Sequence, residues 1–389
     1  MNKMICDHPA KMMGNKNLRR NWIDAAKAVA MFIVVLNHSE LRIPGVNFWG
    51  GMFFVPAFFL LSGYTYHPDH GSYLEYVKKK AKRLLIPYLT ANLFLFLFVL
   101  IKQMLTHNLA SDFVLKSLLG ILYGRNQILV NADYHSKLMI NLNAPTWFLP
   151  ALFVALIMLE GFYRLCKGNE KKVVLIVVIY ALLATGYHYF VPVLLPWCLD
   201  IMPYFLLMML SGNLLKKMDF FGDDQEIIQK KETGEGFVIQ PIAKRAIIVF
   251  LFVVCIVSGL LNGSCNLSLS DAGKSITLMC MAAISSSVLL MVIMNLLEKK
   301  AKKLCACLAG LGKHTLTILC YHYFILVMTM IVLGFLDNFL MPWLTQQDDR
   351  ILQMFFATEK LVAIVVSITA CVIMDLVKER FKIEVRTND

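Results

Sequence analysis

A histidine stands at the end of the first long apolar run of this chain. The run AVAMFIVVL covers residues 28–36, and Asn37 and His38 follow it directly. Imidazole is the side chain best suited to take up and release a proton near neutral pH. His38 is therefore a candidate general base.

Two opposite charges, Asp24 and Lys27, precede His38 within the longer predicted span 22–39. At about 100° per residue, Arg20, Asp24, Lys27 and His38 share one helical face, with His38 about 16 Å beyond Lys27. A charge inside a membrane costs about 3 kcal/mol, so pairing of Asp24 with Lys27 offsets that cost. We expect Asp24 and Lys27 to support His38 on a polar stripe. In the alternative, Arg20 and Lys27 reach the interface and His38 only marks the helix end, a reading we favour for Arg20 alone.

Four further features of the sequence could do chemistry. The segment KKKAKR places five cations in six positions, 78–83, where Lys80 and Arg83 could bind phosphate or contact lipid headgroups. His322 lies about 14 Å beyond Lys313 in another apolar run, as a core group or as part of a polar site. Trp147 is an interface anchor or an aromatic surface on which a ligand ring could stack. Ser62, in a Gly- and Pro-containing run, joins Trp147 and His322 as a substrate-binding candidate.

The composition shows what must position these residues. Of the 389 residues, 58% are hydrophobic and 16% are charged, which is outside the range of soluble chains. The pattern predicts an all-α, polytopic membrane helical bundle with about ten transmembrane helices in a single domain over residues 1–389. The ten apolar runs are 22–39, 48–66, 84–105, 145–163, 172–190, 200–215, 245–262, 275–297, 314–334 and 352–376.

The distribution of Lys and Arg predicts that both termini are cytoplasmic. On that topology, 29 of the 38 basic residues fall on the cytoplasmic side, as the positive-inside rule requires. The net charge of +12 then needs no nucleic-acid partner, because basic loops face an anionic leaflet. We expect a cytoplasmic N-terminal segment at 1–20, an outer loop at 106–144 with a short amphipathic helix, and a cytoplasmic loop at 216–244. The spacing of the cysteines predicts no metal site.

Six stretches together resemble the acyltransferase-3 family of membrane acyltransferases. The first two runs are especially similar to its branch of fucose 4-O-acetyltransferase-like and surface-polysaccharide O-acetyltransferases. In family order, the stretches are WIDAAKAVAMFIVVLNHS, MFFVPAFFLLSGYTY, KKKAKRLLIPYL, TWFLPALF, MPYFLLMMLSGNLL and LGKHTLTILCYH. Two departures stand out: Lys80 with Arg83 replaces the usual pair of arginines, and Phe54-Val55-Pro56 replaces a common His-Met-Pro.

The resemblance implies transfer of an acyl group, commonly acetyl, from cytoplasmic acyl-CoA to a hydroxyl or amino group of an envelope glycan, a lipid-linked sugar or a related small molecule. His38 would be the general base, and an acyl-His intermediate remains an alternative. Lys80 and Arg83 would bind the CoA phosphates, with acyl-CoA (acetyl-CoA) as co-substrate and no metal. We expect a multi-pass protein of the cell (inner or plasma) membrane that contacts the lipid bilayer and could form a homo-oligomer. The alternative function is a proton-coupled membrane transporter that exports a glycan precursor.

Overall fold

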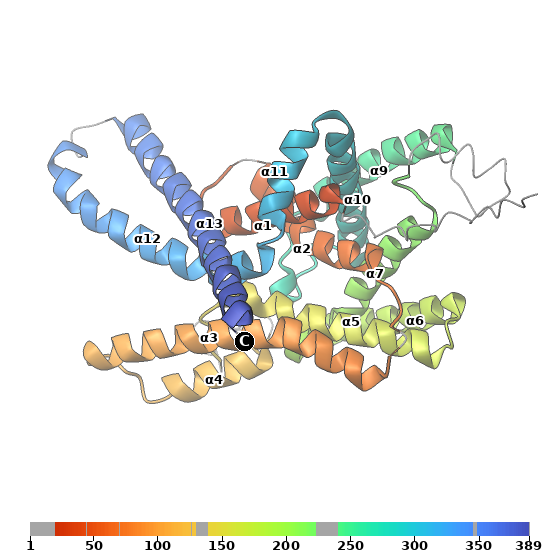
Figure 1. The fold of residues 1–389 in the computed structure, drawn as a ribbon, viewed down its shortest axis with the longest axis horizontal. Helices are drawn as coiled ribbons and strands as arrows, with labels where there is room; N and C mark the ends of the chain where they lie inside the picture. Colours follow the sequence, from red (N-terminus) through yellow and green to blue (C-terminus); the bar gives the residue numbers. More distant parts are fainter. Residues whose placement is uncertain are drawn as a thin grey trace, which may run out of the picture.

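The computed structural model describes residues 20–388 except 44, 70, 126, 130–138, 223–239 and 345–347. This part of the chain is a helical bundle without β-strands (Figure 1). Most of the predicted segments 1–20 and 216–244 lies outside the described residues. The α-helices are α1 (Asn21–His38), α2 (Val46–Tyr64), α3 (Tyr73–Leu105), α4 (Phe113–Tyr123), α5 (Phe148–Leu165), α6 (Glu170–Phe190), α7 (Met202–Lys217), α9 (Pro241–Asn262), α10 (Ile276–Lys300), α11 (Lys302–Gly312), α12 (Thr315–Leu344) and α13 (Asp349–Asn388).

Each of the ten predicted apolar runs corresponds to a helix, which confirms a helical membrane architecture. In the described part of the chain, eight helices are long and apolar enough to cross a membrane, and α1 and α2 are not among them. Helix α1 contains polar residues that lower its mean hydropathy. The apolar segment of α2 in the described part of the chain, Met52–Tyr64, is too short to count. Ten crossings therefore remain a prediction.

Three boundaries are informative. Helix α3 begins at Tyr73, capped by the Ser72 side chain, so the basic segment 78–83 is helical and continuous with the apolar run. A short helix, α4, lies within 106–144 as predicted, and its buried side includes Ser117 and Gly120; its place on the outer side stays a prediction. Helix α11 has no counterpart among the ten runs, because it contains few apolar residues at its start.

Contacts at their ends show the relative direction of α1 and α2. Arg20 donates to the Tyr64 hydroxyl at 3.2 Å at one end of α1 and α2, and the Asn47 amide donates to Asn37 at 2.9 Å at the other. Helix α2 therefore returns antiparallel to α1. Close approach of α7 to α2 depends on glycine: a Cβ on Gly212 of α7 would overlap the Leu60 carbonyl of α2.

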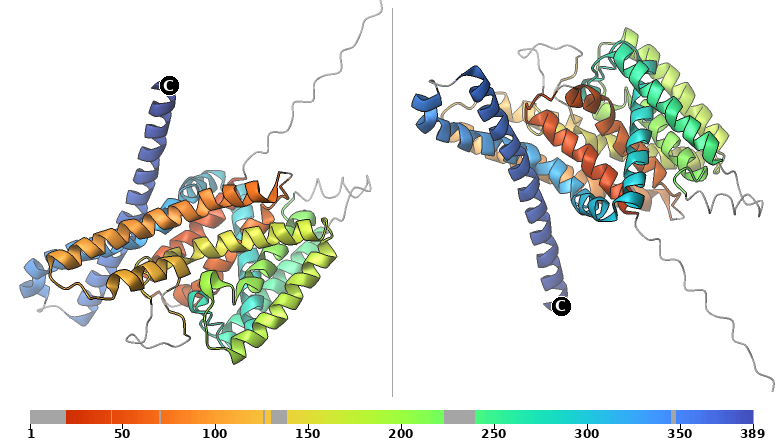
Figure 2. Two further views of the ribbon diagram at one scale, coloured as in Figure 1. Left: turned by 90° about the horizontal axis from the view of Figure 1, so that it is seen from below. Right: turned by 90° about the horizontal axis from the view of Figure 1, so that it is seen from above.

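The three C-terminal helices contact α1 or the loop that follows it. A Cβ on Gly312, at the end of α11, would overlap the Asp24 carbonyl of α1, and α12 starts shortly after it. Helix α13 passes the other end of α1, where the Lys360 ammonium donates to the Glu40 carbonyl at 3.3 Å. It then runs to Asp375, which pairs with His314 at 2.7 Å. Its last turns project beyond the bundle (Figure 2).

The helices fall into an inner and an outer group. The most apolar windows of α5 and α10 are 67% and 61% buried within the protein, whereas those of α6 and α9 are 17% and 22% buried. Large exposed apolar side chains are concentrated on α3, α6, α9, α12 and α13. In water such a surface would drive aggregation, so it is the lipid-facing surface of the bundle.

Candidate functional site

A cavity of about 360 Å³ lies at the end of α1 that carries His38. That volume is at the small end of the usual range for ligand sites and suits one sugar ring or one thioester end. None of the described residues that line it is acidic. The lining residues are Val34, Asn37, His38, Arg42, Asn47, Phe54, Val55, Phe58, Pro145, Trp147, Phe148, Cys265, Asn266, Leu267, Ser268 and Leu319.

The backbone fixes the protonation pattern of His38. Its Nδ1 lies 2.6 Å from the Val34 carbonyl oxygen, one turn earlier in α1. A carbonyl oxygen only accepts hydrogen bonds, so Nδ1 carries a hydrogen, and in the neutral ring Nε2 then holds the lone pair. The His38 side chain lines the cavity and is half-buried. It therefore has the form that a general base requires.

A second imidazole packs against the first. The ring centroids of His38 and His322 are 5.4 Å apart at an interplanar angle of 67°. His322, on α12, is fully buried, and its Nδ1 lies 2.7 Å from the Ile318 carbonyl, so its Nε2 also holds a lone pair. No described residue bonds to that buried Nε2. The sequence left the place of His322 open, and the structure puts it directly behind His38.

Aromatic and aliphatic side chains form the walls of the cavity. Trp147 ends a short 3-10 helix, η2 (Ala144–Trp147), and lines the cavity with its 9% exposed side chain. Phe54 and Val55 of α2 form another wall. These are the positions where the resembled family commonly has His and Met, so His322 is the only second imidazole that the described residues bring to His38.

A buried amide network holds Trp147 in place. The Asn143 amide donates to the Cys320 carbonyl of α12 at 2.9 Å, and the Asn92 amide of α3 donates to the Thr146 hydroxyl at 2.9 Å. Thr146 in turn donates to the Asn143 carbonyl at 2.7 Å. Segment η2 is thus tied to α3 and α12 at once. Nothing in the sequence periodicity indicated these three polar residues.

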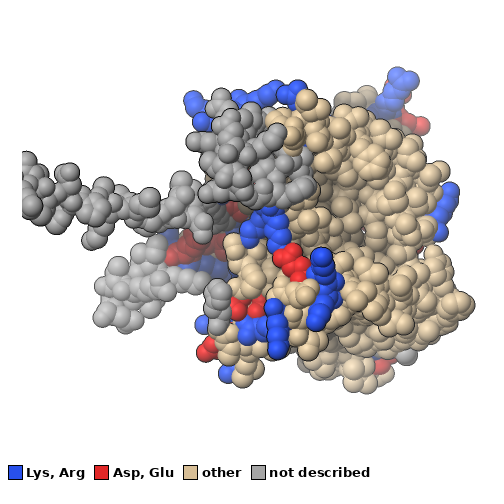
Figure 3. All heavy atoms as spheres, turned by 90° about the vertical axis from the view of Figure 1, so that its right-hand side faces the viewer, with Lys and Arg blue, Asp and Glu red and all other residues tan. Residues whose placement is uncertain are grey.

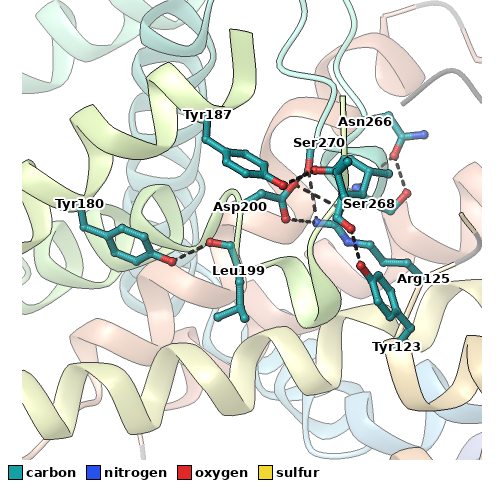
Figure 4. Close-up of polar contacts among 11 residues, drawn as sticks. Tyr123, Arg125, Tyr180, Tyr187, Leu199, Asp200, Asn266, Ser268 and Ser270 are labelled. Carbon is teal, nitrogen blue, oxygen red and sulfur yellow. Dashed lines mark hydrogen bonds and ion pairs between the residues drawn. The ribbon is translucent and has the colours of Figure 1, made fainter. Parts of the chain in front are cut away.

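An ion pair that the sequence did not indicate clamps the loop beside the cavity (Figure 4). Arg125 donates to the two carboxylate oxygens of Asp200 at 3.2 and 2.9 Å and to the Ser270 hydroxyl at 3.2 Å. Ser270 also bonds to Asp200. All three side chains are buried. Since Asn266 and Ser268 of the same loop line the cavity, the clamp fixes that wall.

The predicted pair of Asp24 and Lys27 forms but does not reach the cavity. The Lys27 ammonium lies 3.3 Å from the Asp24 carboxylate, whose side chain is 3% exposed. The Asp24 backbone packs against Gly312 of α11, and neither side chain lines the cavity with His38. Ser62, half-buried near the end of α2, is also absent from the cavity lining.

Lys80 and Arg83 lie near the start of α3, at the end of the bundle opposite His38. The Lys80 ammonium sits 4.9 Å from the centre of the Tyr76 ring and is half-buried, while Arg83 is exposed. Figure 3 views the side of the molecule where α3 begins, and Lys and Arg side chains gather there with Asp and Glu among them. In the adjoining loop, burial and the nearby Lys216 ammonium lower the pKa of His67.

Comparison with known proteins gives one match. A family model described as an acyltransferase domain (acyltransferase-3) matches residues 20–376, from the start of α1 into α13. No curated protein and no solved structure matches the chain.

Proposed function

Because the chain belongs to the acyltransferase-3 family, we propose that it moves an acetyl or other short acyl group from cytoplasmic acyl-CoA to a hydroxyl of an envelope polysaccharide or lipid-linked sugar. The observation that carries this proposal is His38, whose Nδ1 hydrogen is committed to Val34 and whose Nε2 is available at a cavity. The branch of surface-polysaccharide O-acetyltransferases, suggested by the first two spans, is part of the proposal.

The proposed reaction uses the lone pair on His38 Nε2. The acceptor hydroxyl donates its proton to His38 Nε2 as its oxygen attacks the thioester carbonyl carbon. A carbon–oxygen bond forms, the carbon–sulfur bond breaks, and the CoA thiolate takes the proton back from the imidazolium. The Nδ1 bond to Val34 keeps the ring in one orientation throughout.

The neighbouring side chains have distinct roles. His322 packs on the His38 ring and orients it, and Trp147 gives a flat aromatic surface for a sugar ring in a cavity of about 360 Å³. The Asp24–Lys27 pair supports α1 and does not transfer the proton, since it does not border the cavity. Ser62 does not line the cavity either, so we give it no direct contact with the acceptor.

The donor and the acceptor reach the cavity from different ends. Lys80 and Arg83 lie at the end of the bundle opposite His38, where they would bind the CoA phosphates. The pantetheine arm would then extend through the bundle toward His38. If this end is cytoplasmic, the enzyme joins a cytoplasmic donor to an outward acceptor.

The test is release of CoA from acetyl-CoA by the purified protein in nanodiscs without an ion gradient, with a membrane glycan extract as the acceptor source. We expect the wild type to acetylate the extract and His38→Ala to lose this activity while remaining folded. Full activity of His38→Ala would remove its role as the base. The absence of any acetyl-CoA turnover, together with gradient-driven glycan export, would favour the transporter instead.

A further inference from the structure

Two side-chain amides in the cavity are held in a known orientation by their hydrogen bonds. The backbone N–H of Ile43 donates to Asn47 Oδ1 at 2.6 Å, so the other end of that amide must be Nδ2. Asn47 Nδ2 donates to Asn37 Oδ1 at 2.9 Å. The remaining atom of the Asn37 amide is therefore Nδ2, a hydrogen-bond donor.

The Asn37 donor has no hydrogen-bond partner among the residues that the structure describes. Its Nδ2 is buried, and no described residue accepts a hydrogen bond from it. Asn37 lines the same cavity as His38, its neighbour in the last turn of α1. Folding rarely leaves a buried donor unmet, so such a group beside a base points to an acceptor atom supplied by a ligand.

Asn266, an exposed residue on the other wall of the cavity, also has its side-chain amide oriented by hydrogen bonds. Its Oδ1 accepts from the Ser268 backbone N–H at 3.2 Å and from the Ser268 hydroxyl at 2.7 Å. Its Nδ2 therefore faces away from Ser268, as Figure 4 shows. Ser270 of the buried Arg125–Asp200–Ser270 clamp lies four residues after Asn266, so the clamp holds this segment in place.

We propose that Asn37 and Asn266 donate hydrogen bonds to the oxyanion that forms on the thioester carbonyl, an inference that rests on the proposed acyl transfer. As the nucleophile bonds to the carbonyl carbon, the π electrons move to the oxygen, and the two N–H groups stabilise that charge. When the carbon–sulfur bond breaks, the electron pair returns and the carbonyl is restored. Donors fixed before the reaction need no reorganisation during it.

Asn→Asp substitutions separate this role from a structural one. Aspartate keeps the Oδ1 acceptor that holds each side chain but removes the Nδ2 donor. With acetyl-CoA and hydroxylamine as the probe pair, we expect Asn37→Asp and Asn266→Asp each to lower kcat about 100-fold or more, with little change in the KM for acetyl-CoA. The matched control is Asn213→Asp, a buried amide of α7 that bonds Tyr163 outside the cavity; its kcat should stay near wild type.

A sulfur analogue of the donor tests the contact itself. In the dithioester of CoA the carbonyl oxygen is replaced by sulfur, a weak hydrogen-bond acceptor. We expect the ratio of the acetyl-CoA rate to the dithioester rate to fall at least about tenfold in Asn37→Ala and Asn266→Ala, because the lost donors act on oxygen only. An unchanged ratio, or a change confined to the KM of the nucleophile, would overturn the proposal. If the wild type consumes no acetyl-CoA with any nucleophile, the proposed function itself fails.

Discussion

Loss of the Arg125 guanidinium should be the most destabilising single change in the loops around the cavity. In Arg125→Met, three hydrogen bonds disappear and the Asp200 carboxylate, 4% exposed, is left without its counter-ion. Breaking a buried ion pair on one side costs about 3–5 kcal/mol. We expect that loss in the free energy of unfolding, measured by tryptophan fluorescence during SDS titration of the protein in detergent micelles.

Two controls isolate the unpaired charge. Arg125→Met combined with Asp200→Leu removes both charges and should return the stability to within about 1 kcal/mol of the wild type. Lys217→Met breaks the pair with Glu170, whose side chains are 41% and 54% exposed, and should cost less than about 1 kcal/mol. The reasoning is refuted if Arg125→Met costs no more than Lys217→Met, or if the double variant is as unstable as the single one.

Three further changes test other parts of the structure. His322→Gln should lower kcat about 10-fold or more through loss of the ring contact with His38, with an unchanged KM for acetyl-CoA; a shift in KM alone would assign His322 to binding. Lys80→Ala with Arg83→Ala should weaken acetyl-CoA binding about 10-fold or more in calorimetric titration, and equal affinity would move the phosphate site elsewhere. Gly312→Ala should destabilise the protein by about 1–3 kcal/mol in the same SDS titration, because its Cβ meets the Asp24 carbonyl; wild-type stability would mean that α11 is free to shift.

Local patterns in the sequence predicted the helices well. The hydropathy of a segment is a property of residues adjacent in the sequence, so the apolar runs can be located without knowing the fold. Each of them is found in a helix of the structure. The Asp24–Lys27 pair was also predictable, since residues three apart on a helix meet whatever surrounds them. The start of α3 was placed too late, because charged residues inside a helix hide its extent from hydropathy. For the same reason α11 was missed.

The candidate site was predictable only in part. His38 and Trp147 were chosen from their types and positions, and the structure places both at one cavity. The polar stripe of α1 was more misleading. Asp24, Lys27 and His38 share a face of the helix, but the rise along the axis brings α11 to Asp24 and α12 to His38, so the stripe does not form one site.

The sequence by itself determined a membrane bundle and a histidine at the end of its first helix, because hydropathy and helical spacing are local. Only the tertiary structure decided what meets that histidine. His322 comes from α12, and Arg125 reaches Asp200 and Ser270, which are 75 and 145 residues further along the chain. Such contacts depend on the packing order of the helices and on the path of the loops between them. No periodicity within one helix carries that information.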